Sequence, residues 1–157
     1  MDNITAPISW LDLQWYALDH NKRICLFKSN GGGIPCQLEG IDMDPVYDFF
    51  ENLTEMADNE LIVNPELEWI AKLKTVDEKN NYLKNFLFFA KRGLVCYDRT
   101  YTSRPIDPRY HLVVKPSKVL DLHNIPNSIL NKIIQNPQGF NIINNESIDI
   151  SKIVWNM

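Results

Sequence analysis

Three consecutive glycines, Gly31-Gly32-Gly33, follow an apolar segment and invite comparison with loops that hold phosphate groups. A Walker loop needs a lysine and a hydroxyl residue directly after its glycines, whereas Ile34-Pro35 follow here. A Rossmann loop opens a helix, which the proline and the residues after it do not favour. The sequence therefore predicts no nucleotide cofactor, and we expect these glycines to meet a local need for positive φ.

Two groups of residues combine a nucleophile with a potential base. Cys96 lies two residues before Asp98 on a predicted strand, and His111 lies on another strand that would bring it close if the two paired. Ser29 with the Asp-His pair at 19–20 forms the second group. Neither has a nucleophile elbow or a cysteine-protease signature. We expect Cys96 to be a buried core thiol and assign no catalytic residue.

A metal site is not indicated by the spacing of potential ligands. The three histidines are widely separated, with no HxH or HExxH pattern. Cys25, Cys36 and Cys96 form no CxxC pair and are expected to be reduced, buried thiols. Asp42-x-Asp44 lacks the glycine and terminal glutamate of a calcium-binding loop, and helix capping explains it instead. No metal ligand is assigned.

The segment Arg99-Thr-Tyr-Thr-Ser-Arg104 has the composition of a recognition loop. Arginine and tyrosine are common at interface hot spots, and loop residues are more often functional than core residues. We predict that this loop lies near the loop that contains Gly31–Gly33, here called the glycine loop, and that the two loops bind a protein partner. The predicted binding residues are Ser29, Gly31, Gly32, Gly33, Arg99, Tyr101 and Arg104.

The first elements that must position these residues are a hairpin and three helices. Two apolar segments joined by Asp19-His-Asn-Lys predict strands over 13–18 and 23–28. The helices have recognisable starts, and their predicted extents are 45–57 with Asp44 as N-cap, 64–74 with Asn64 as N-cap, and a helix from the Thr75/Glu78 capping box to Gly93.

The rest of the chain adds mostly extended segments. They are predicted as strands over 93–98, 110–115 and 147–153, an extended piece over 119–122, a helix over 126–134 and an exposed Asn-rich loop over 135–146. This order lacks regular βαβ alternation. The predicted fold class is α+β, as one domain over residues 1–157, with a mainly antiparallel sheet and helices packed on one face.

Composition restricts the class of protein. A chain of 157 residues with 45% hydrophobic residues can form a substantial core. Sixteen basic and 20 acidic residues give a net charge of −4 without a basic run, so no nucleic-acid partner is expected, and a basic protein partner suits the charge. The longest uncharged apolar run, Phe86 to Ala90, is far below the ~20 residues of a membrane span. Without a signal sequence, a cytoplasmic location is expected.

A resemblance adds a functional hypothesis. Three segments resemble a group of small uncharacterised bacterial proteins, namely Trp15-Tyr-Ala-Leu-Asp-x5-Cys-Leu-Phe-x-Ser-x-Gly-Gly-Gly-Ile-Pro35, Tyr110-x-Leu-Val-x-Lys-Pro116 and Ile125-Pro-x-x-Ile129. The resemblance implies a single-domain cytoplasmic protein encoded among genes of secreted polymorphic toxins, with an immunity role. It implies no catalytic residues.

Two hypotheses from different classes follow. The first is a non-catalytic protein-binding domain, an immunity protein that binds and blocks a toxin domain. The second is a small enzyme or ligand-binding domain with a cleft beside Gly31–Gly33, where polar groups from residues 28–36 and 96–111 converge. A glycine loop flat against the core and a Cys96 sealed from solvent would argue against the second.

Overall fold

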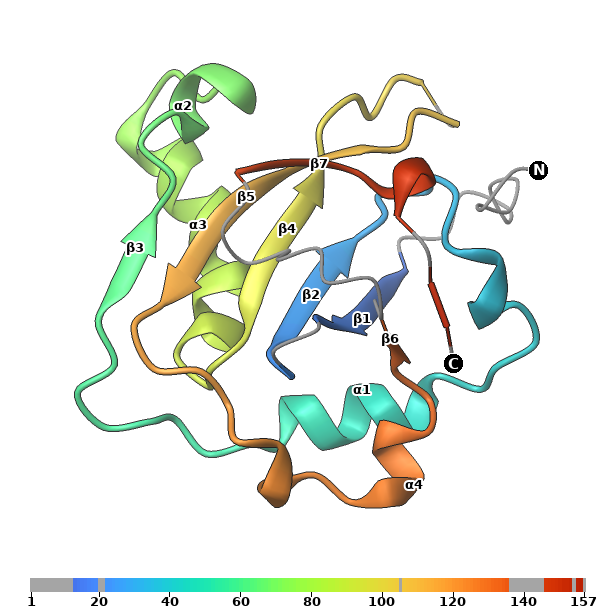
Figure 1. Cartoon of the computed structure of the whole chain (residues 1–157). Coiled ribbons are helices and arrows are strands. Elements are labelled where there is room, and N and C mark those ends of the chain that lie inside the picture. Colours follow the sequence, from blue (N-terminus) through green and yellow to red (C-terminus); the bar gives the residue numbers. More distant parts are fainter. Residues whose placement is uncertain (1–12, 20–21, 105, 136–145, 154, 157) are drawn as a thin grey trace.

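The computed structural model describes residues 13–19, 22–104, 106–135, 146–153 and 155–156, and the predicted hairpin is its first element (Figure 1). β1 (Gln14–Leu18) and β2 (Ile24–Lys28) pair antiparallel. The Asp19 carboxylate accepts a hydrogen bond from the Arg23 backbone at 3.0 Å, as expected for a turn aspartate. The hairpin prediction is confirmed.

Five more strands join this hairpin in one mixed sheet of the described residues. The order is β3-β5-β4-β2-β1-β6, with β7 also paired to β5. All neighbours are antiparallel except β2 with β4 and β1 with β6. The bounds are β3 (Leu61–Val63), β4 (Val95–Arg99), β5 (Arg109–Pro116), β6 (Ile134–Gln135) and β7 (Ser147–Asp149). The mainly antiparallel α+β prediction is confirmed.

β5 is the strand that organises the sheet around the candidate site. One edge pairs with β4, and the other is shared end to end by β3 and β7. A register shift in the β4–β5 ladder falls between Cys96 and Tyr97, and beyond it Asp98 lies opposite His111. Two polar side chains are thereby brought together at the end of β4.

α3 (Val76–Ala90) is the helix whose ends the sequence marks best. Thr75 Oγ1 accepts from the Glu78 backbone N–H at 3.1 Å, while the Glu78 carboxylate accepts from the Lys74 N–H at 2.7 Å. Gly93 follows with a φ of 94°. The predicted N-cap is confirmed, although the reciprocal bond reaches one residue further back than in an ideal capping box. The C-cap is Lys91 rather than Gly93, which lies two residues beyond it.

The other helices are shorter than predicted. α1 (Asp44–Glu51) stops before 57, because the Asn52 side chain turns back to the Asp48 carbonyl. Its N-cap is Met43 rather than Asp44, which is instead the first helical residue and donates its N–H to the Asp42 carboxylate. α2 (Leu67–Ile70) fills only the middle of 64–74, and its N-cap is Glu66 rather than Asn64, whose side-chain oxygen accepts from the Glu66 N–H.

The C-terminal part differs from prediction because pairing with distant strands overrides local periodicity. α4 (Asn127–Leu130) ends early, and β6 takes the last residue of the predicted helix and the residue after it by pairing with β1. The predicted strand over 147–153 is β7 followed by a 3-10 turn, and 119–122 forms no strand. Apart from its two end residues, the predicted loop over 135–146 lies outside the described residues.

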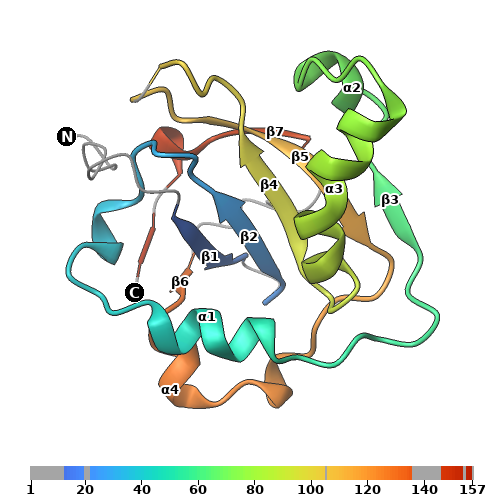
Figure 2. The same ribbon diagram turned by 180° about the vertical axis from the view of Figure 1, so that it is seen from behind.

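The two faces of the sheet are covered differently. α1, α3 and α4 pack on one face, as predicted, around Tyr16, Phe50 and Phe86. The opposite face carries an aromatic cluster in which Trp15 stacks on Phe27 at 4.2 Å. Side chains from β7 and the residues after it pack against this cluster, and Figures 1 and 2 show the course of that C-terminal segment. No helix among the described residues has the length and apolar character needed to cross a membrane.

Candidate functional site

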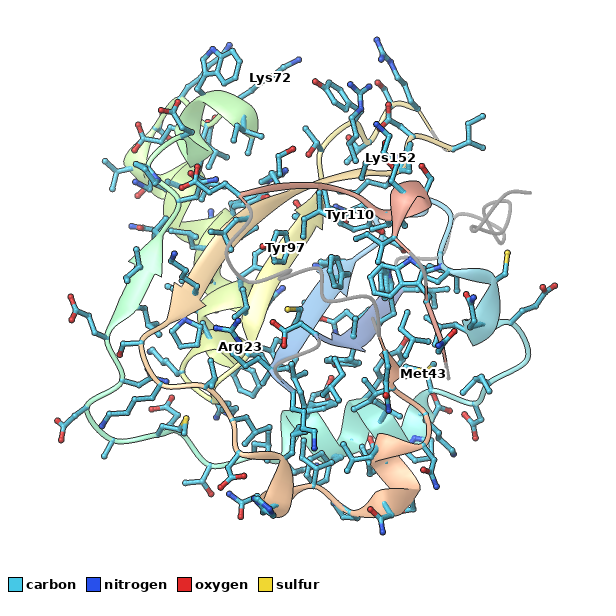
Figure 3. All side chains as sticks on the ribbon, in the orientation of Figure 1. Arg23, Met43, Lys72, Tyr97, Tyr110 and Lys152 are labelled. Carbon is cyan, nitrogen blue, oxygen red and sulfur yellow. The ribbon has the colours of Figure 1, made fainter. Side chains whose placement is uncertain are left out.

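A cleft of about 1260 Å³ opens at the end of β4 where Asp98 and His111 meet. One wall is α2 and the turn after it, residues 68–74, and the other is the loop over residues 100–103. In Figure 1 these walls stand on either side of the upper end of β4, and Figure 3 shows Lys72 beside α2. Tyr82 from α3 contributes to the lining between them.

The buried Arg99 side chain holds the second wall, the loop over residues 100–103, in place. Its side chain is 2% exposed, and its guanidinium donates to five backbone carbonyls. These acceptors come from the two loops that the sequence predicted to be neighbours, and they are Ser29, Asn30, Tyr101, Thr102 and Arg104. The predicted proximity of the loops is confirmed, and the Arg99 side chain is the internal link between them.

The glycine loop is a tight turn built to receive this guanidinium. Asn30 and Gly31 both have positive φ, 47° and 77°, and the Gly32 N–H donates to the Ser29 carbonyl at 2.9 Å. Two positive φ values at the central positions define a type I′ turn. A Cβ on Gly32 would lie 2.2 Å from Arg99 Nε. Gly31 thus meets a backbone requirement, and Gly32 leaves room for Arg99.

Five side chains form a hydrogen-bonded floor beneath the cleft. The Tyr82 hydroxyl lies 2.5 Å from Asp98 Oδ2 and 3.0 Å from His111 Nε2. Thr100 Oγ1 lies 2.9 Å from His111 Nδ1, and the Asn30 side-chain amide donates to Asp98 Oδ1. Tyr82, Asp98, Thr100 and His111 all line the cleft, so this network borders its interior.

Burial determines the ionisation of the floor. It lowers the pKa of His111 to about 4, so the imidazole is neutral near pH 7. The pKa of Tyr82 is raised, first by burial and then by the charge and hydrogen bond of Asp98. The floor therefore presents a neutral imidazole and a protonated phenol.

Cys96 does not belong to this network. It is fully buried, and its thiol approaches the Phe86 carbonyl at 3.4 Å. Burial raises its pKa, which opposes the thiolate that a nucleophile requires. Of the group considered from sequence, Asp98 and His111 converge, while Cys96 is a core residue as expected.

The rim carries exposed aromatic side chains. Trp69 on α2 is 82% exposed, and Tyr101 on the facing loop is 40% exposed. The guanidinium carbon of Arg109 lies 4.1 Å from the centre of the Tyr101 ring, and that of Arg104 lies 5.3 Å from it. Hydrogen bonds from Arg109 hold the pKa of Asp107 below its usual value. Tyr101 is thus fixed at the rim by arginines of this same chain.

The predicted binding residues separate into two sets. Tyr101 and Arg104 are exposed, and Tyr101 lines the cleft. The buried set comprises Ser29, Gly31, Gly32, Gly33 and Arg99. Asn30, rather than the glycines, brings the first loop to the cleft.

Trp69 was missed as a site residue although the sequence contains a signal for it. In a helix over 64–74, the apolar residues Leu67 and Ile70 are three residues apart and share one face. A tryptophan two residues after Leu67, next to Glu68, then falls on the outward face. An aromatic residue on a predicted polar face is informative because large exposed apolar groups are uncommon.

The charges around the cleft are balanced. Its charged lining residues are Glu66, Glu68, Asp98 and Glu146 on the acidic side and Lys72, Lys74, Arg99 and Arg109 on the basic side. Within the described ranges, no three histidine, cysteine or acidic side chains are grouped closely enough to hold a metal ion. The cleft is thus an aromatic-rimmed, polar-floored surface without strong net charge.

Comparison of the chain with protein-family models, curated proteins and solved structures gives no match in any of the three. The functional interpretation therefore depends on the residues of the cleft and on the resemblance described above.

Proposed function

We propose that the chain is a non-catalytic, cytoplasmic protein-binding domain, an immunity protein that binds and neutralises a bacterial toxin domain through the cleft. The observation that carries this proposal is Trp69, which is 82% exposed and lines the cleft together with Tyr101 of the opposite wall. Tryptophan and tyrosine are over-represented among residues that dominate binding energy at protein interfaces. A partner is proposed to bury both.

The architecture of the cleft supports a partner that inserts a loop or a side chain. The floor and the second wall are fixed by Asp98 and Arg99, so the surface is organised before binding, which lowers the entropic cost of association. A stoichiometric complex with a toxin domain would bury on the order of 1,600 Å² in total. No nucleic acid is proposed as a partner.

The test begins with the neighbouring genes. A toxin domain encoded beside this gene is co-expressed with the chain, and complex formation and growth rescue are measured. Trp69→Ala is expected to weaken binding about 30-fold or more, because truncating a hot-spot residue costs about 2 kcal/mol or more.

Val76→Ala is the matched control. Val76 is also apolar and 74% exposed, but it lies outside the cleft at the start of α3. Equal binding by both variants, or neighbouring genes unrelated to toxins together with no bound partner, would contradict the proposal.

A second candidate, a ligand-binding domain or small enzyme, draws its support from the floor. His111, Tyr82 and Thr100 converge in a cleft of about 1260 Å³, which exceeds the roughly 300–1,000 Å³ of typical small-molecule sites. The glycines of the 31–33 loop are buried, and Cys96 is sealed from solvent, which argues against the form of this hypothesis based on the sequence. The excess volume favours a macromolecular partner.

A further inference from the structure

Asp98 determines which group donates and which accepts in each hydrogen bond of the cleft floor. Both of its carboxylate oxygens accept, one from the Asn30 amide and one from the Tyr82 hydroxyl at 2.5 Å. Charge-assisted O–H···O⁻ bonds have lengths of about 2.5–2.7 Å. Because an ionised carboxylate has no hydrogen to give, the Tyr82 hydroxyl is the donor and its hydrogen is committed to Asp98.

The direction passes from Tyr82 to His111. Since the Tyr82 hydroxyl donates to Asp98, its oxygen acts as the acceptor for His111 Nε2 at 3.0 Å. His111 Nε2 must then carry the ring hydrogen. A neutral imidazole has a single N–H, so Nδ1 is an acceptor.

Thr100 completes the chain at the cleft. Its hydroxyl lies 2.9 Å from His111 Nδ1, which has no hydrogen to give, so Thr100 donates. The hydroxyl hydrogen points at His111, and the remaining lone pairs on Thr100 Oγ1 can only accept. The buried Asp98 carboxylate thus determines that the Thr100 hydroxyl donates to His111 and can only accept a hydrogen bond from a group in the cleft.

We propose that the cleft floor recognises a neutral N–H donor, a peptide or side-chain amide of the partner, which donates a hydrogen bond to Thr100 Oγ1. The balanced charges of the lining favour a neutral group over an ion. A carbonyl or carboxylate placed there would face an oxygen without an available hydrogen and would lose its hydrogen bonds to water. That the donor belongs to a protein rests on the proposed function, whereas the preference for a donor follows from the chain of hydrogen bonds.

The experiment uses two amides that differ in one N–H. N-methylacetamide and N,N-dimethylacetamide are titrated separately into the full chain, and the NMR signals of Thr100 and His111 are followed. N-methylacetamide is expected to shift them saturably, with an affinity at least about tenfold higher than that of the dimethyl compound. The ¹⁵N signals of the His111 ring are expected to show a hydrogen on Nε2 and none on Nδ1.

Three variants test the mechanism. Thr100→Val keeps the shape and removes the acceptor, so it is expected to abolish the preference, and Thr100→Ser is expected to retain it. Tyr82→Phe removes the group that fixes the His111 tautomer, so a mixture of tautomers and a reduced preference are expected. Equal responses to the two amides, no response to either, or a hydrogen on Nδ1 in the natural chain would overturn the proposal.

The two proposals can fail separately. If a toxin domain binds in a Trp69-dependent manner but the amides are not distinguished, the donor preference is wrong and the protein-binding function stands. If the amides are distinguished but no toxin domain encoded nearby binds, the protein-binding function is wrong and the donor preference stands.

Discussion

Asp98 and Arg99 are adjacent at the end of β4, have opposite charges and are both buried, yet the structure holds them in different ways. Arg99 is surrounded by backbone carbonyls and fixes two loops. Asp98 accepts from side chains, and its hydrogen-bonded chain ends at the cleft. Because adjacent strand residues point to opposite faces, one charge serves the scaffold and the other serves the proposed site.

The largest expected effect on stability comes from replacing Arg99, which fixes the two loops. Arg99→Ala removes the guanidinium from five carbonyls, of which those of Ser29, Tyr101 and Arg104 keep a backbone donor, and it breaks the link between the two loops. The free energy of unfolding is therefore expected to fall by about 3–5 kcal/mol. Urea denaturation measures it. Arg99→Lys, which lacks the planar fork, is expected to recover only part of the loss. A loss below about 1 kcal/mol in Arg99→Ala would contradict the assigned role.

The hydrogen-bonded chain that begins at Asp98 includes His111, whose burial should make the stability of the protein depend on pH. His111 in the folded chain has a pKa of about 4, below the 6.5 of an unperturbed histidine, so the unfolded chain binds more protons between these values. The contribution of neutral His111 to the free energy of unfolding is therefore fully present above about pH 6.5. It is lost as the pH falls toward 4, by up to about 3 kcal/mol. His111→Gln is expected to show a shallower decrease in denaturation measured across this range. Parallel pH profiles of the two proteins would exclude this contribution.

A third prediction concerns the contact between the glycine loop and Arg99. Gly32→Ala places a Cβ 2.2 Å from Arg99 Nε and is expected to cost about 1–3 kcal/mol of stability. The cost should largely disappear when Arg99 is also replaced by alanine, because the clash is then absent.

Gly31→Ala is the control for this contact. Its cost of about 1–2 kcal/mol arises from a φ of 77° and should persist in the Arg99→Ala background. Identical behaviour of the two glycine variants in that background would show that Gly32 does not act through Arg99.

The smallest expected effect on stability is at the rim. Trp69→Ala removes a side chain that is 82% exposed, so the free energy of unfolding should change by no more than about 0.5 kcal/mol. Thermal denaturation provides the measurement. A large loss would mean that Trp69 supports the fold of the α2 wall, and its loss of partner binding could not then be attributed to direct contact.

The sequence predicted those elements whose boundaries are marked locally. α3 has Thr75 and Gly93 at its ends, and the first hairpin has a turn aspartate. β3 and β6 were missed because segments of three and two residues have almost no periodicity, and they form only by pairing with β5 and β1. Such short strands are determined by pairing with distant strands, which a local sequence pattern does not show.

The same limit applies to the site. The loop composition correctly brought the Arg99 segment to the glycine loop, but nothing local distinguishes an arginine that faces a partner from one that faces inward. The acceptors of Arg99 include carbonyls 70 and 69 residues away, at Ser29 and Asn30. The convergence of Asp98 and His111 depends on strand register, whereas Trp69 could have been identified from its position on a helical face.

The exposed indole at the cleft also makes the proposed binding surface visible by optical spectroscopy. Trp15 and Trp155 are buried in the aromatic cluster and are protected from a quencher such as acrylamide. Trp69 is open to it, so the difference in quenching between the natural chain and Trp69→Phe isolates the signal of one wall of the cleft. A partner seated there would protect that indole, so occupancy could be measured without a label.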